Sequence, residues 1–302
     1  MYSDPYDAVM FVDPTPSPAG DASTIPVRRM SFAESLASLP KHFAGDGDLI
    51  TSHLFATLSG VFPDGEEYFV RSVRRYRDEV SDPDLRRQVA AFIGQEALHG
   101  REHRALNDRL AELGYGTKGV ERYARMGLAF RERVMSPLVN LASTAALEHF
   151  TATLAETVLT SADARAAIGA QEILDVLLWH SLEESEHKAV AFDVYRAVGG
   201  SERTRRWVME FITVTFIGGM AIQTAIGVAR DRETYRSGNL RRSFRRLRTN
   251  PFFTRRVWTM LRSYNRVGFH PHDHDTTELL DEWRDRLFGV DGTLNDRMLR
   301  SA

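Results

Sequence analysis

The chain has 302 residues, 43% of them hydrophobic, with 39 Lys and Arg against 41 Asp and Glu, a formal net charge of −2 and no cysteine. The absence of cysteine excludes disulfides, cysteine nucleophiles, iron–sulfur clusters and cysteine-based zinc sites, so any metal must be bound by His, Asp or Glu. The length and composition are those of a globular protein with a sizeable core.

The N-terminal segment has no apolar period, and its first 26 residues contain five prolines. This composition predicts a mobile tail, which we extend to residue 44. We therefore divide the chain into a tail (1–44), a helical domain (45–200) and a C-terminal helical extension (201–302). The segment contains no basic run followed by an apolar run, so a secretory signal is not expected. Together with the missing cysteine, this predicts a cytoplasmic protein.

Helical periodicity begins near Asp48, and proline marks the start of most expected helices. The expected long helices begin at Pro63, at Pro83 after an Asp82 cap, at Pro137 after Ser136, and at Gln171, and the last three end near Leu113, Thr160 and Val198. The segment Phe62–Gly65 is expected to end one helix and open the next. Four long helices with one longer connection in the middle predict an all-α four-helix bundle.

Each expected helix places at least one carboxylate on its apolar face, which a bundle core does not tolerate without a compensating partner. These inward residues are Glu66 on the first helix, Glu96, His99 and His103 on the second, Glu148 on the third, and His180, Glu184 and His187 on the fourth. The pattern of a Glu followed by Glu-x-x-His therefore occurs twice along the chain.

A Glu and a His three residues apart converge on one point beside a helix, where both can bind a metal. Four carboxylates in a dry core would repel one another unless cations neutralise them. We therefore predict a site for two divalent cations, preferably iron with manganese as the alternative, bound by Glu66, Glu96, His99, Glu148, Glu184 and His187. His180 is predicted as a further ligand or as the hydrogen-bond partner of one, and His103 as a hydrogen-bond partner. The competing interpretation is a metal-free network of buried hydrogen bonds.

Five sequence strings resemble those of the bacterial predicted metal-dependent hydrolase family, a branch of the ferritin-like superfamily. They are FPDGEEYFVRSVR, QEALHGREH, ALEHFTA, WHSLEESEHKAVAFDVY and GFHP, and the resemblance covers about residues 35 to 280. It implies a ferritin-like fold and metal ligation by the six residues predicted above. The arrangement of His180, Glu184 and His187 is also similar to that of di-iron enzymes of the p-aminobenzoate N-oxygenase type, in which the extra His is a ligand.

Three functions follow from such a site. A carboxylate-rich set with two or three histidines favours a di-iron oxidoreductase that activates O2 beside an apolar pocket for a small-molecule substrate. The alternative is a metal-dependent hydrolase in which the two ions activate water. A non-enzymatic iron-binding protein is the third, disfavoured because storage does not require the long C-terminal region.

The C-terminal third contains an uncharged run and a basic run. Residues 211–229 carry no charge and predict either a buried fifth helix, which we prefer, or a membrane span at the lower limit of length. Residues 230–266 contain 12 arginines against two acidic residues. This predicts peripheral contact of residues 207–256 with anionic lipid at the inner face of the membrane, or else salt bridges to the acidic bundle. Nucleic acid is not an expected partner, and a homodimer is a further option.

Overall fold

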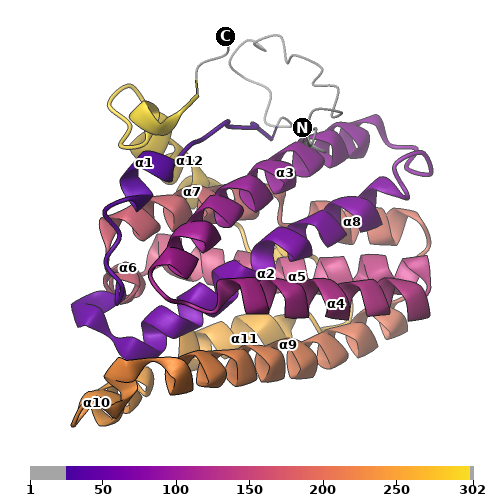
Figure 1. Cartoon of the computed structure of the whole chain (residues 1–302). Helices are drawn as coiled ribbons and strands as arrows, with labels where there is room; N and C mark the ends of the chain where they lie inside the picture. The colour runs from indigo at the N-terminus through magenta and orange to yellow at the C-terminus, as the bar shows by residue number, and fades with distance from the viewer. Residues whose placement is uncertain (1–24, 300–302) are drawn as a thin grey trace, which may run out of the picture.

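The computed structural model describes residues 25–299, and in this part of the chain helices joined by irregular segments make up the fold (Figure 1). Within it, the single extended pairing is one antiparallel bridge between Met30 and Met298. The all-α prediction is therefore confirmed. The α-helices are α1 (Ala33–Leu36), α2 (Leu49–Arg74), α3 (Pro83–Glu112), α4 (Thr117–Val134), α5 (Pro137–Thr160), α6 (Ala162–Ile168), α7 (Gln171–His187), α8 (Val190–Ala197), α9 (Glu202–Arg230), α10 (Asn239–Leu247), α11 (Arg255–Ser263) and α12 (Thr277–Phe288).

Four long helices, α2, α3, α5 and α7, form the centre of the molecule and are called the four-helix core below. Helix α2 packs along α3, α5 packs along α7, and the two pairs meet through contacts of α2 with α5 and of α3 with α7 and α8. Helix α4 supplies the long middle connection and covers α2. The ferritin-like assignment of this arrangement remains a prediction.

The predicted starts of two core helices are confirmed by their caps. The Asp82 carboxylate accepts a hydrogen bond from the backbone N–H of Asp84, and the Ser136 hydroxyl accepts one from Val139. Each is followed by proline at the first helical position, where the missing N–H has no partner to lose. Helix α3 stops before Gly114, whose φ of +94° favours glycine.

The predicted break at Pro63 is wrong, because α2 runs through it as one helix. Proline at this position has no N–H to donate to the carbonyl of Ser59, four residues earlier. That carbonyl instead accepts a hydrogen bond from Nδ2 of Asn107 on α3, at 3.1 Å. A partner from the neighbouring helix thus replaces the missing helical hydrogen bond, so α2 continues.

The prediction of a single helix over residues 171–198 is also wrong. The segment divides into α7 and α8 at Lys188 and Ala189. The Lys188 ammonium group donates hydrogen bonds to the His274 carbonyl and the Thr276 hydroxyl. These contacts tie the break to the segment that precedes α12. The predicted stop at Gly199, with a φ of +83°, is confirmed.

The predicted tail extends too far along the chain. Residues 1–24 lie outside the described part, whereas residues 25–44 pack onto the core with Met30, Phe32, Leu36, Leu39 and Phe43 buried. Their apolar side chains are spaced irregularly, so periodicity does not reveal them. The free energy gained by burying these aromatic and aliphatic groups explains why the segment is held.

Helix α9 packs lengthwise on α2 and α5, but it is not the buried fifth helix that we preferred (Figure 1). By length and composition α9 is apolar enough to cross a membrane, which on its own is weak evidence, and 17% of its most apolar 18-residue window is buried. Its inward side carries Val208, Met209 and Ile212, while Val214 and Ile222 are exposed. One face of α9 therefore covers the four-helix core and the other carries exposed apolar side chains.

Two large apolar clusters occupy the two ends of the four-helix core. On α3, for example, Val89, Phe92 and Ile93 belong to one cluster, and Leu98 and Leu106 belong to the other. On α2, α3 and α7 the inward carboxylate lies where one cluster gives way to the other, and on α5 Glu148 lies near the end of one cluster, before Phe150. The fold therefore surrounds a polar centre with apolar side chains at both ends.

Candidate metal centre

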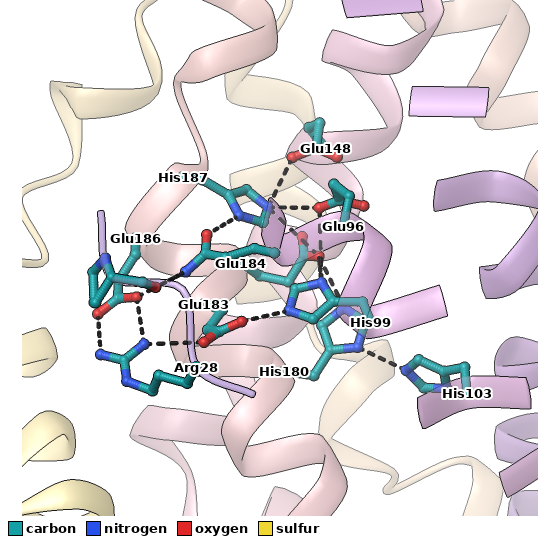
Figure 2. Close-up of polar contacts among 12 residues, drawn as sticks. Arg28, Glu96, His99, His103, Glu148, His180, Glu183, Glu184, Glu186 and His187 are labelled. Carbon is teal, nitrogen blue, oxygen red and sulfur yellow. Dashed lines mark hydrogen bonds and ion pairs between the residues drawn. The ribbon is translucent and has the colours of Figure 1, made fainter. Parts of the chain in front are cut away.

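The seven predicted ligands, with His103 beside them, meet in the middle of the four-helix core. Figure 2 shows six of the seven pointing toward one another from α3, α5 and α7. Each of the seven residues is at most 4% exposed. Glu66 joins them from α2, where Gly100 of α3 allows a close approach, since a Cβ there would lie 3.2 Å from a Glu66 carboxylate oxygen.

Two of the groups that the candidate ligand atoms form share Glu96. In one group, atoms of Glu66, Glu96 and His99 lie within 4.8 Å of one another, and in the other, atoms of Glu96, Glu148 and His187 do so. Nε2 of His187 lies 3.1 Å from Oε1 of Glu96 and 3.3 Å from Oε2 of Glu148. A carboxylate shared by two such groups is the geometry of a residue that can bridge two cations.

Glu184 lies between the histidines and completes the cluster. Its Oε1 atom lies 2.8 Å from Nε2 of His180, 3.6 Å from Nδ1 of His99 and 3.7 Å from Nε2 of His187. The rings of His180 and His99 are stacked with their centroids 4.2 Å apart. The structure thus brings together the seven candidate ligands that the sequence analysis named, with His103 beside them.

The chemistry of the donor set can be tested against the hydrogen bonds of the site. Buried polar atoms in folded proteins are almost always hydrogen-bonded, so an accumulation of exceptions needs an explanation. Of 17 buried side-chain atoms without a partner in the described part of the chain, nine belong to this cluster. They are both carboxylate oxygens of Glu66, Glu96 and Glu148, Oε2 of Glu184, Nδ1 of His99 and Nε2 of His187. Divalent cations are the partners that this set of oxygen and imidazole donors fits.

The pKa values of two carboxyl groups are raised because these groups are buried close to other carboxylates. Burial, together with the charge of Glu96, holds the pKa of Glu66 well above its usual range. Burial and the charges of Glu184 and Glu96 raise the pKa of Glu148 to about 8. In the absence of cations these two groups therefore retain protons at neutral pH, and bound cations would take the place of those protons.

A buried ion pair orients His99. Nε2 of His99 lies 3.0 Å from Oε2 of Glu183, whose other oxygen lies 3.1 Å from the Arg28 guanidinium group. Arg28 is held by Glu186 as well, at 2.8 Å. Because an ionised carboxylate can only accept, Nε2 of His99 is the donor and Nδ1 faces the cluster. Hydrogen bonding from the remote ring nitrogen to a carboxylate is typical of metal-binding histidine.

An amide orients His187 in the same way. Nδ1 of His187 lies 2.8 Å from Oε1 of Gln95, whose Nε2 donates to the Pro26 carbonyl and to Glu186. Since the amide nitrogen is engaged with these two acceptors, its oxygen must accept from Nδ1 of His187. Nε2 of His187 is therefore the nitrogen that faces Glu96 and Glu148.

His180 is oriented by a hydrogen-bond chain that passes through His103. The amide nitrogen of Asn107 donates to Glu121 and to the Ser59 carbonyl, so its oxygen accepts from the Ser59 hydroxyl at 2.7 Å. That hydroxyl then accepts from Nδ1 of His103, at 3.0 Å. Nε2 of His103 in turn accepts from Nδ1 of His180, at 2.7 Å (Figure 2).

The direction of this chain leaves Nε2 of His180 without a proton and facing Glu184. Burial lowers the pKa of both His103 and His180, which keeps the two rings neutral and the direction fixed. A lone pair aimed at a carboxylate is unfavourable unless a proton or a metal cation lies between the two. The geometry supports His180 as a ligand and His103 as its hydrogen-bond partner.

Sequence reasoning missed the residues that orient the histidines. Glu183 lies in sequence between the predicted ligands His180 and Glu184, and it is fully buried and ion-paired with Arg28. Its partner Arg28 comes from the segment taken for a tail, so no spacing pattern connects the two. Asn107 did carry a signal, since it follows His103 by four residues on the same helical stripe.

A separate group of metal-type side chains lies at the start of α2. His42, His53 and Asp231 approach one another, with Oδ2 of Asp231 3.0 Å from Nε2 of His42 and 3.1 Å from Nε2 of His53. Nζ of Lys41 lies 3.1 Å from the same oxygen. This ammonium group already neutralises the carboxylate, so the group is an ion-paired connection between the N-terminal segment and the end of α9.

An all-helical protein with a buried cluster of glutamates and histidines belongs to the class of metal-dependent helical proteins. The model of a protein family described as predicted metal-dependent hydrolase matches residues 26–275, most of the chain. The chain therefore belongs to the predicted metal-dependent hydrolase family, which confirms that resemblance. No curated protein and no solved structure matches the chain. The family supports the hydrolase alternative, and the preference for a di-iron oxidoreductase remains a prediction.

Proposed function

We propose that the protein is a metal-dependent hydrolase whose cluster of four glutamates and three histidines binds two divalent cations. The observation that carries this proposal is a group of nine buried oxygen and nitrogen atoms, at one place in the core, that have no hydrogen-bond partner. A metal-free network would have to satisfy those atoms internally. Membership of a family described as metal-dependent hydrolases supports the reaction type.

Two bound cations would acidify water and polarise the oxygen of the bond to be cleaved. The chain's own residues hold the site for this chemistry. Glu183 and Gln95 fix the rings of His99 and His187, and His103 fixes His180. In hydrolysis, the water oxygen bonds to the acyl carbon, the bond to the leaving oxygen breaks, and the leaving group departs with a proton.

A di-iron oxidoreductase is the second candidate, because four carboxylates with three imidazoles also suit iron that reacts with O2. Manganese accepts the same ligands. The reaction with oxygen needs an external reductant and a substrate bound beside the ions. Both candidates require the same seven residues, so metal content alone does not separate them.

The deciding experiment loads metal-free protein with zinc, manganese or, without oxygen, ferrous iron. We expect about two bound ions per chain and metal-dependent cleavage of a p-nitrophenyl acyl ester. Consumption of O2 by the ferrous protein, with no ester cleavage by any form, would instead establish the second candidate. Tight iron binding with neither reaction would leave an iron-binding protein.

A pair of variants on α5 controls for unspecific damage. Glu148→Gln removes a proposed ligand, whereas Glu156→Gln alters a buried carboxylate on the same helix that pairs with Arg256 and His274. We expect the first variant to lose bound metal and activity, and the second to retain both. Equal metal content in the two variants would contradict the proposal.

A further inference from the structure

A large cavity lies beside the metal cluster, between the four-helix core and the C-terminal extension. Its volume is about 960 Å³, and its walls come from α2, α5, α7, α9, α10 and α11. On its buried side the wall includes His180, Ser181 and Glu184. On its outer side lie the exposed rings of Phe253 and Trp258. The cavity therefore connects the candidate metal centre with the protein surface.

The lining of the cavity is apolar along its length. In the described part of the chain, His180 and Glu184 are the only Asp, Glu, His, Lys or Arg side chains among its lining residues. The remaining wall consists mainly of aliphatic and aromatic groups. The volume is near the upper end of the range for small-molecule sites, so the cavity can hold a substantial ligand.

The shape of the cavity is elongated. Its wall on α9 runs from Phe216 to Ala229, and at 1.5 Å per residue this segment is about 20 Å long. Its wall on α2 runs from Ile50 to Phe62. A site that is long, apolar and polar only beside the metal cluster matches a ligand with an extended hydrocarbon chain and one reactive polar group.

We propose that this cavity is the substrate site and that the substrate is a long-chain acyl compound, with its acyl carbon beside Glu184 and its chain along α9. The reactive end of this assignment rests on the proposed function, whereas chain binding does not. Each buried methylene should increase affinity about fourfold, which corresponds to about 0.8 kcal/mol.

Chain binding is tested on metal-free protein, so that the result does not depend on catalysis. The probe is a dansylated undecanoic acid, displaced by octanol, decanol or dodecanol. Ala225→Trp narrows the cavity on α9, and Ala90→Trp adds the same ring at an exposed position of α3 outside it. We expect affinity to increase about fourfold per methylene in the wild type and in Ala90→Trp.

For Ala225→Trp we expect at least a tenfold loss of dodecanol affinity and unchanged metal content. Affinities independent of chain length, or the same in both tryptophan variants, would overturn the assignment. If chain binding follows the expectation but no metal binds, the proposed function fails and the cavity assignment stands. If metal-dependent hydrolysis occurs at a rate that does not depend on chain length, the proposed function stands and the cavity assignment fails.

A second inference concerns the outward side of α9 together with α10, which we call the α9–α10 face. The outward side of α9 exposes Trp207, Val214 and Ile222, with Val214 72% exposed. In α10, Arg241, Arg242 and Arg245 are exposed and have no acidic partner among the described residues. Exposed apolar side chains beside unpaired arginines are typical of segments that lie in a membrane interface.

The packing of α9 decides how such a contact would be made. Because α9 lies along α2 and α5 over its length, its exposed side forms a stripe on the protein surface (Figure 1). We propose that the α9–α10 face binds the surface of an anionic bilayer, with the stripe parallel to the membrane. Four of the twelve arginines in residues 230–266 form ion pairs with described residues, namely Arg236, Arg246, Arg256 and Arg266. Salt bridges within the described part of the chain therefore account for a minority of this charge.

Co-sedimentation with vesicles of phosphatidylglycerol and phosphatidylcholine tests this proposal. Replacing Arg241, Arg242 and Arg245 with Gln should weaken binding about a hundredfold, since each arginine contributes about 1 kcal/mol at an anionic surface. Replacing the exposed Arg74, Arg75 and Arg77 at the far end of α2 with Gln is the matched control and should change little. Equal effects of the two triples, or a stable dimer in solution that does not bind vesicles, would overturn it.

Discussion

Nδ1 of His180 lies 2.7 Å from Nε2 of His103, and this contact connects the metal cluster through Ser59 with Asn107, one turn further along α3. The orientation of the Asn107 amide fixes the Ser59 hydroxyl, which fixes the tautomer of His103 and then that of His180. The orientation of an amide that touches no proposed ligand thus determines which nitrogen of His180 lacks a proton. Metal affinity should therefore depend on residues outside the cluster.

Ser59→Ala tests this dependence. Loss of the hydroxyl leaves Nδ1 of His103 without its acceptor, so the tautomers of both rings are no longer fixed. We expect metal affinity, measured by competition with a chelator, to fall about 10- to 100-fold. Ser72→Ala on the same helix removes a buried hydroxyl that bonds to Thr144 and serves as the control. An equal loss of affinity in the two variants would show that the chain does not act on His180.

Glu183→Leu tests the ion pair behind His99. The change leaves Nε2 of His99 without an acceptor and removes one of the two carboxylates that hold Arg28. We expect a 10- to 100-fold loss of metal affinity, together with a loss of folding stability of about 1–3 kcal/mol from the unpaired buried groups. Chelator competition and thermal unfolding measure the two effects. Retained affinity in a destabilised protein would assign Glu183 to folding alone.

Metal binding should release protons and strengthen as the pH rises. Burial lowers the pKa of His99, but hydrogen bonds to Glu183 and Glu96 outweigh it and raise the pKa to about 10. With the raised pKa values of Glu66 and Glu148, this means that several groups carry protons in metal-free protein at pH 7. Ligation requires their release, so affinity should rise more than tenfold per pH unit between about pH 6 and pH 8.

Calorimetry in two buffers with different ionisation enthalpies counts the released protons. A rise in affinity of more than tenfold per pH unit corresponds to the release of more than one proton by the wild type. His103 and His180 contribute none, because their lowered pKa values leave them neutral. Metal binding with no proton release would show that the cluster is already ionised.

The residues of the candidate centre were predictable because they follow local rules of helix geometry. Glu96 and His99, or Glu184 and His187, are three residues apart and must lie on one side of a helix. Arg28 could not be found in this way, since its contact with Glu183 spans 155 residues and depends on how an irregular segment packs. The continuous α2 was missed for a similar reason, because the donor that replaces the Pro63 N–H comes from Asn107 on another helix.

Pro63 therefore has a role that its local effect on the helix does not reveal. In Pro63→Ala, the new N–H at position 63 competes with Asn107 for the Ser59 carbonyl and loosens the orientation of the Asn107 amide. Proline in a helix interior costs about 3 kcal/mol, and its replacement by Ala also removes buried ring atoms and the restriction on the unfolded chain, so these contributions largely offset one another. We expect thermal stability close to that of the wild type and a metal affinity about tenfold lower. Unchanged affinity in a folded Pro63→Ala protein would show that the Asn107 amide keeps its orientation without the free carbonyl.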